Sequence, residues 1–104
     1  MDLRRKQTRS DAFGTPIPRI ELTGEYDLAN KEDIASLFSS LRADGPAVID
    51  MTNVTYIDSA VLGELAKLRA RFKQQTVTLL VRAKNIRRLL EVVRFDELFA
   101  VVDG

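Results

Sequence analysis

One short run, residues 47–51 (AVIDM), constrains the fold of this 104-residue chain more than any other feature. It is too short and too apolar for a surface helix, and it is typical of a buried, central strand in a parallel sheet. Residues 52–63 follow it directly and lead into a long amphipathic segment. We therefore expect a strand, a tight loop and a helix in succession, with Ser59 where the loop becomes the helix.

The rest of the chain alternates between helix and strand patterns. Apolar residues recur with the spacing of one helix face in residues 34–41 and again in residues 86–93. Another amphipathic helix is expected from Ser59 to about Gln74, with its basic side chains on the solvated flanks: Lys67, Arg69, Arg71 and Lys73. Further strands are expected at residues 17–22, 76–81 and 100–102.

Several positions carry local expectations. Asn30 is a good N-cap for the first helix, and residues 23–27 before it are expected to form a turn-like connection. Pro18 suggests an edge position or a strand start for the first predicted strand. Gly63 lies inside the second helix, where glycine costs about 1 kcal/mol relative to alanine. We expect a close packing contact with the sheet at Gly63 to offset that cost, and a glycine tolerated by chance is the alternative.

The order of elements predicts a single α/β domain. Right-handed crossovers favour a mostly parallel central sheet of about four to five strands, with three or more helices packed mainly on one face. Residues 16–104 are assigned to this domain. Residues 1–15 are polar and lack periodicity, which favours a solvated, basic N-terminal tail, with a short edge strand around residues 12–13 as an option.

The composition narrows the possible functions. The chain has no cysteine and no histidine, which excludes disulfides, thiolate metal sites and Ser-His-Asp hydrolysis. No glycine-rich phosphate-binding motif is present. We therefore expect a binding module with no cofactor and no metal, and we rank an enzyme or nucleotide-binding domain last.

Hydropathy and charge bear on location and partners. No apolar run approaches the roughly 20 residues of a membrane helix, and no secretory signal is evident, so we expect a cytoplasmic protein without membrane insertion. The net charge of +1 combines +3 in residues 1–19, from five basic and two acidic side chains, with −2 in the remainder. Such a weakly acidic domain gives little support for direct nucleic-acid binding.

Three motifs together resemble one known family. They are LTGEYD at residues 22–27, VIDMTNVTYIDS at residues 48–59 and LG at residues 62–63. In order and spacing they resemble the STAS domain family, the sulphate-transporter and anti-sigma-factor-antagonist domains, over residues 17–102. The family pattern runs from an apolar strand through D-hydrophobic-S/T-x-V and an aromatic residue to I/V-D-S-S/A-G-L-G.

The resemblance implies a free-standing bacterial anti-sigma factor antagonist (anti-anti-sigma factor) that regulates transcription in a stress response. Such proteins bind an anti-sigma factor that is also a serine kinase, and the sigma factor is released. Phosphorylation of the first serine after I-D, here Ser59, blocks rebinding, and a phosphatase restores the active form. The resemblance also implies a docking surface made of Gly24, Glu25, Asp27, Asp58, Ala60 and Val61.

Two alternatives stay open at this site. Ser59 and Asp58 are both good N-caps, so Ser59 could serve the helix alone. A phosphoserine at this helix N-terminus would gain backbone donors and a favourable dipole. Ala60 and Val61 stand where the family has its second serine and a glycine, and Val61 adds a β-branched side chain beside Ser59.

A second function within the same family is a non-phosphorylated STAS subunit of a membrane transport complex of the lipid-transport ATP-binding-cassette type. The Asp-Ser-Ala sequence at residues 58–60 makes that alternative worth keeping. The oligomeric state is open, with a homodimer as one option.

Overall fold

The computed structural model describes residues 2–10 and 16–104, with side chains from residue 17 onward. Within these residues, five strands form one sheet: β1 (Asp2–Ser10), β2 (Pro16–Tyr26), β3 (Ala47–Ile57), β4 (Val77–Val81) and β5 (Ala100–Asp103). Three α-helices connect the parallel strands: α1 (Lys31–Ser39), α2 (Ser59–Phe72) and α3 (Lys84–Val92). Short 3-10 helices, η1 (Leu28–Asn30) and η2 (Phe95–Glu97), precede α1 and β5.

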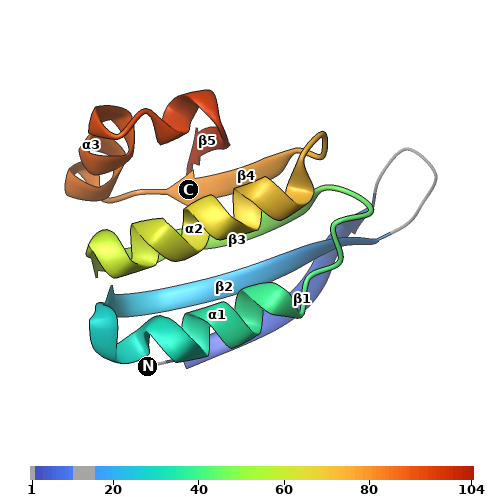
Figure 1. Cartoon of the computed structure of the whole chain (residues 1–104), viewed down its shortest axis with the longest axis horizontal. Coiled ribbons are helices and arrows are strands. Elements are labelled where there is room, and N and C mark those ends of the chain that lie inside the picture. Colours follow the sequence, from blue (N-terminus) through green and yellow to red (C-terminus); the bar gives the residue numbers. More distant parts are fainter. Residues whose placement is uncertain (1, 11–15) are drawn as a thin grey trace.

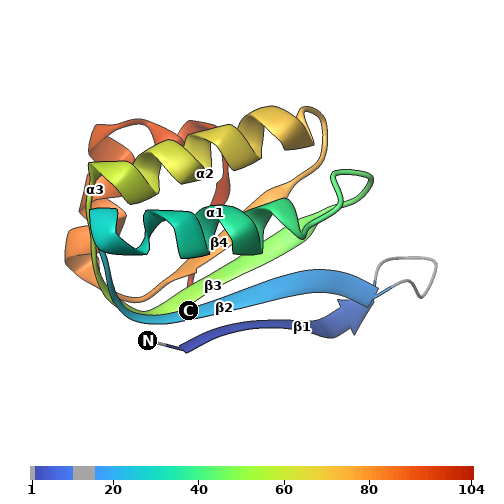
Figure 2. The ribbon, with the colours of Figure 1, turned by 60° about the horizontal axis from the view of Figure 1, so that its bottom comes forward.

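The strand order in the sheet is β1-β2-β3-β4-β5, with β1 antiparallel to β2 and every later pair parallel (Figure 1). In Figure 2 the helices α1 and α2 lie along one face of the sheet. Right-handed crossovers between neighbouring parallel strands place their connecting helices on the same face. The predicted α/β fold, with a mostly parallel sheet and helices mainly on one face, is confirmed.

One hydrophobic core lies between the sheet and the helices. Alternate residues of β4, Val77, Leu79 and Val81, are buried because successive side chains of a strand point to opposite faces. Each helix contributes a buried stripe to the same cluster, such as Ile34 from α1 and Leu90 from α3. The helical spacing in the sequence therefore identified the faces that pack on the sheet.

The N-terminal segment differs from its prediction. Residues 2–10 form β1, whose backbone pairs with β2 from Asp2 opposite Thr23 to Ser10 opposite Pro16. A solvated tail was expected there because the segment lacks apolar periodicity, but an edge strand needs only a partner backbone. The edge strand expected around residues 12–13 lies outside the described residues, and the division at residue 16 stays a prediction.

The strands β2 and β3 are longer than predicted. The turn expected at residues 23–27 is strand as far as Tyr26, and most of the loop expected after residue 51 belongs to β3. Gly24 accommodates an irregular stretch of β2 with a φ of 91° and a register shift on each side. The buried Tyr26 hydroxyl accepts a hydrogen bond from the Thr23 N–H at 2.9 Å and closes this stretch.

Pro18 lies inside β2, which has neighbours on both sides and is not an edge strand. The pairing with β3 begins one residue later, at Arg19 opposite Val48. Pro18 therefore precedes the parallel ladder and removes no donor from it. The edge position was wrong, and the start of the β3 ladder explains why proline is tolerated.

Two arginines of α2 that were expected as solvated flanks also make structural contacts; Arg71 is exposed, as predicted, and Arg69 is partly buried. The Arg71 guanidinium donates to the carbonyl oxygens of Phe38 and Leu41 at 3.1 and 2.5 Å, after the end of α1. The Phe38 carbonyl also accepts the Leu41 N–H at 3.0 Å. Arg69 donates to the Leu98 carbonyl at 2.6 Å and to the Lys73 carbonyl at 2.7 Å. Both side chains tie α2 to neighbouring segments.

A partly buried ion pair lies on the other face of the sheet. The Asp50 carboxylate is 5% exposed, pairs with the Arg19 guanidinium and accepts the Thr52 N–H at 2.9 Å. Burial tends to raise the pKa of Asp50, but the hydrogen bonds from Thr52 and the interaction with Arg19 outweigh it, so the pKa lies below its usual value of 3.8.

Asp50→Asn should therefore destabilise the protein by about 1–3 kcal/mol at pH 7, because a charged hydrogen-bond acceptor is lost. A lowered carboxyl pKa stabilises the fold above the unfolded-state pKa, and this stabilisation is lost as the pH falls below about 4. The difference between wild type and variant in urea unfolding should shrink from pH 7 to pH 3. Asp44→Asn, which removes an exposed ion pair with Arg42, is the matched control and should change stability by less than about 0.5 kcal/mol at either pH. A gap that stays constant with pH would contradict the assignment.

The packing contact expected at Gly63 is absent among the described residues. Gly63 is exposed, and a Cβ atom added to it would meet no atom within 4 Å. The glycine therefore weakens α2 without a gain inside the described fold.

Gly63→Ala should raise the free energy of unfolding by about 0.5–1 kcal/mol, because alanine restricts the unfolded chain and favours the helix. Thermal unfolding should show a rise in the melting temperature of about 2–6 °C. Gly24→Ala is the opposing control, since its φ of 91° strains any L side chain despite open space around the Cβ. A fall in stability for Gly63→Ala would contradict the assignment of Gly63 as an exposed helix position without packing contacts.

Candidate functional site

The residues singled out by the sequence meet at the carboxyl ends of two neighbouring parallel strands. Gly24 and Glu25 lie at the end of β2, and Asp58 and Ser59 follow the end of β3. The strand register places Glu25 opposite Tyr56. Carboxyl ends of parallel strands share one edge of the sheet, so residues about thirty positions apart form one surface.

Asp58 joins the two segments of this surface. Its Oδ1 atom accepts the N–H groups of Ala60 and Val61 at 3.0 and 3.2 Å, which makes Asp58 the N-cap of α2. Its Oδ2 atom accepts the Leu28 N–H at 3.0 Å, from the segment after β2. One carboxylate therefore starts the helix and fixes the neighbouring loop against it.

Ser59 is the first residue of α2 and is exposed. Because Asp58 supplies the cap, the interpretation of Ser59 as the N-cap is wrong. None of the hydrogen bonds described for residues 17–104 involves the Ser59 hydroxyl. The side chain is therefore available at the surface, at the positive end of the α2 dipole.

The occupied cap changes what a phosphoryl group at Ser59 would meet. The N–H groups of the second and third helical residues, Ala60 and Val61, already bind Asp58. The gain of backbone donors expected for a phosphoserine is therefore smaller than the sequence suggested. A phosphoryl group on Ser59 would therefore face solvent. The helix dipole would favour its charge, but the first-turn N–H groups that Asp58 already binds would not be free to bind it.

Val61 does not lie on this surface. Its side chain is 1% exposed and belongs to the hydrophobic core, so the expectation that its bulk adjoins Ser59 at the surface is wrong. Ala60 is partly buried. The apolar stripe of α2 begins at Val61, which is why the side chain turns inward there.

The segment after β2 is shaped by a reciprocal cap. Asp27 accepts the Ala29 N–H at 2.9 Å, and Asn30 accepts the Asp27 N–H through its side chain at 3.0 Å. Asn30 occupies the N-cap position of α1, but its side chain makes no cap hydrogen bond to that helix. The prediction that Asn30 occupies the N-cap position of α1 is therefore correct, but its side chain accepts a hydrogen bond from Asp27 and not from α1. Glu25 and Asp27 are exposed and give this surface a negative charge.

Two exposed apolar side chains at this end of the sheet were not among the site residues predicted from the sequence. Leu28 is 69% exposed and Tyr56 is 47% exposed, next to Asp27 and opposite Glu25 respectively. Asn85, in the first turn of α3, also reaches this end and donates to the Thr55 carbonyl at 3.1 Å. Tyr56 belongs to a quoted motif, but no sequence signal marked Leu28 or Asn85.

Among residues 17–104, no group of three His, Cys, Asp or Glu side chains is arranged to hold a metal ion. In the same part of the chain, no helix has the length and apolar character needed to cross a membrane. The chemistry that this end of the sheet offers is an accessible hydroxyl within an acidic surface that carries exposed apolar groups.

Asp58→Ala should lower the free energy of unfolding by about 1–2 kcal/mol, the usual effect of losing an N-cap. Ser59→Ala should change it by less than about 0.5 kcal/mol, as for an exposed residue without partners. Urea unfolding followed by circular dichroism measures both, and Asp58→Asn should recover most of the cap. A larger loss for Ser59→Ala than for Asp58→Ala would contradict the cap assignment.

Comparison with known proteins gives matches along most of the chain. Residues 15–102 match the protein family described as Mlab, STAS domain. A STAS-domain containing protein from Pseudomonas aeruginosa (strain UCBPP-PA14) is 27% identical over 85 residues, which cover 79% of this chain and 84% of that protein.

Solved structures share the fold. An anti-sigma factor antagonist from Mycobacterium paratuberculosis has a TM-score of 0.73 at 18% identity, covering 99% of this chain and 87% of that one. The anti-sigma factor antagonist SpoIIAA in its unphosphorylated form has a TM-score of 0.64 at 14% identity, covering 86% of this chain and 82% of that one. At such identities the likeness establishes the fold alone.

Proposed function

Because the chain belongs to the Mlab STAS domain family, we propose that it is a non-enzymatic interaction switch, an anti-sigma factor antagonist controlled at Ser59. It binds an anti-sigma factor that is also a serine kinase, and the sigma factor is released. Phosphorylation of Ser59 ends this binding, and a phosphatase restores it. The protein acts in the cytoplasm as a regulator of stress-response transcription.

The observation that carries this proposal is the division of labour between Asp58 and Ser59. Asp58 alone caps α2, so Ser59 has no structural task in the described fold. An exposed serine at a helix start is accessible to a kinase, and its modification leaves the cap in place. Ala60 removes the neighbouring hydroxyl of the family motif, so Ser59 is the one acceptor of the Asp-Ser-Ala sequence.

The docking surface of this proposal consists of exposed groups around Ser59. Leu28 and Tyr56 offer apolar area, and Glu25 and Asp27 offer negative charge. Gly24, Asp58 and Ala60 hold the backbone of this surface in place, whereas the buried Val61 is left out. Such a mixture of an aromatic anchor and charged groups is typical of protein interfaces.

The switch is electrostatic. Phosphorylation adds about −1.5 to −2 charge to a surface that already carries the exposed carboxylates of Glu25 and Asp27. Like-charge repulsion and the burial of an unpaired phosphate at a close interface can cost several kcal/mol. A loss of about 2.7 kcal/mol weakens a complex a hundredfold, so no large conformational change is needed.

A subunit of a membrane transport complex is the second candidate. It is favoured by Ala60 in place of the family's second serine. In this role the same surface would bind its partner permanently, without phosphorylation. The two candidates therefore differ in the response of the complex to a charge at Ser59.

The test uses the full chain and an extract of its native host supplied with ATP. Mass spectrometry should find phosphate on Ser59 in wild type and none after Ser59→Ala. Ser39→Ala, which removes another exposed serine, should leave the modification unchanged. Phosphate at another position, or none in wild type, would refute the phosphoacceptor.

A capture experiment then separates the two candidates. A kinase-like partner should be retained by wild type and Ser59→Ala and weakened about a hundredfold or more by Ser59→Asp. Mass spectrometry identifies the retained protein. Equal retention of a permease or ATPase by all three forms would favour the transport subunit instead.

A further inference from the structure

Glu64 is a buried charge with little compensation. Among residues 17–104, Asp50 and Glu64 are the two buried polar or charged residues, and Glu64 is 6% exposed. Asp50 is satisfied by Arg19 and Thr52, as described above. In the same part of the chain, Glu64 has a single partner, the ammonium of Lys67 at 3.2 Å, and that lysine is 71% exposed. One exposed lysine offsets little of the cost of burying a carboxylate.

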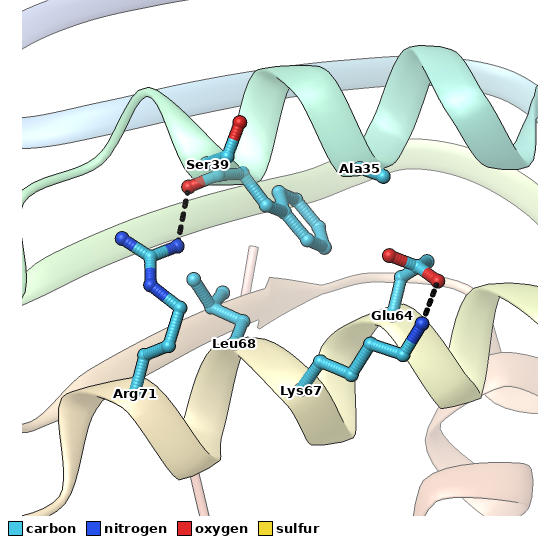
Figure 3. Close-up of a pocket in the computed structure, with 7 residues that line it drawn as sticks. Ala35, Ser39, Glu64, Lys67, Leu68 and Arg71 are labelled. Atoms are coloured by element: carbon cyan, nitrogen blue, oxygen red, sulfur yellow. Dashed lines mark hydrogen bonds and ion pairs between the residues drawn. The ribbon is translucent and has the colours of Figure 1, made fainter.

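The Glu64 carboxylate lies at a pocket between α1 and α2. Figure 3 shows Glu64 extending from α2 toward α1, in the region of Ala35, with the Lys67 ammonium beside it. Phe38 and Leu68 also line this pocket. The pocket is therefore largely apolar, and its charged lining consists of the Glu64 carboxylate and the cationic side chains of Lys67 and Arg71.

The size of the pocket decides what kind of occupant it admits. Its volume is about 170 Å³, below the roughly 300–1,000 Å³ of pockets that hold drug-sized ligands. That space suits one amino-acid side chain. An apolar lining with one buried carboxylate suits a side chain with an aliphatic stem and a cationic end.

Neither of the two cations that line the pocket prevents a partner's cation from binding the Glu64 carboxylate. Arg71 lines the pocket, but its guanidinium is bound to the carbonyl oxygens of Phe38 and Leu41 at the end of α1. Lys67 provides one hydrogen bond from a solvated side chain, and holding it there costs rotamer entropy. A cation from a partner must therefore displace only Lys67.

We propose that this pocket binds an arginine side chain of a protein partner, with its guanidinium on Glu64 and its stem against Phe38 and Leu68. Arginine is favoured over lysine because its planar fork can bind both carboxylate oxygens, whereas a lysine would repeat the contact that Lys67 makes.

The pocket adds a second anchor point beside the surface around Ser59. Glu64 follows Ser59 by five residues, about 7.5 Å along the axis of α2. The same five residues turn about 140° around α2, so a partner that binds both points extends from the helix start onto the side of α2 that faces α1. The inference does not depend on phosphorylation, because the pocket and its carboxylate belong to the unmodified protein.

The test is an NMR titration of the full chain with capped arginine, N-acetyl-arginine-N-methylamide. Signals of Ala35, Phe38 and Leu68 should shift saturably, with a dissociation constant of about 1–10 mM for a single ion pair with a small apolar contact. Capped citrulline, which is nearly isosteric but uncharged, should bind at least about tenfold more weakly. Equal shifts with both compounds would refute the proposal.

Variants locate the site. Glu64→Gln should weaken capped arginine at least about tenfold, and Glu32→Gln, at an exposed glutamate of α1, should not. Lys67→Gln removes the competing cation from the surface and should tighten binding about threefold. The Lys67→Gln variant keeps the test decisive if Glu64→Gln fails to fold. If Lys67→Gln does not bind capped arginine more tightly than wild type, the proposal is overturned. Ser59→Asp should leave the affinity within about twofold, so failure of the phosphorylation proposal would leave this result intact.

Discussion

The site depends on one carboxylate, that of Asp58. One oxygen binds the first N–H groups of α2, and the other binds Leu28 in the segment after β2. Without the first contact the first N–H groups of the helix would lose their cap, and without the second the segment after β2 would lose its side-chain link to the start of α2. Asp58 therefore acts as a positioning residue, and its capping role is what leaves Ser59 at the surface without a structural task.

Periodicity predicted the parts of the fold in which side chains alternate between core and solvent. The three helices and the strand β4 were placed to within two or three residues, because their apolar faces repeat regularly. The ends of β2 and β3 were missed because they are polar and irregular: Asn53 of β3 pairs with Thr23 of β2, and Thr52 and Thr55 lie where the register shifts. The strand β1 was missed for the same reason, since its pairing with β2 leaves no apolar pattern in the sequence.

The candidate site was predicted in outline, and its internal assignments were not. The motif identified Asp58 and Ser59, but both residue types are good caps, so only the geometry assigns the cap to Asp58. Val61 already belonged to the apolar stripe of α2, so its burial could have been inferred from helical spacing alone. Glu64 lies on the same stripe, three residues after Val61 and four before Leu68, but its charge made burial unexpected.

The order of the strands in the sheet is the order of the strands along the chain. Each parallel strand therefore pairs with the strand that precedes it in the sequence, and each α-helix connects two strands that are neighbours in the sheet. No strand needs a later, distant segment as its pairing partner. The domain can therefore fold one βα unit at a time as the chain leaves the ribosome. The Asp58–Leu28 hydrogen bond would form as soon as the second of these units docks on the first.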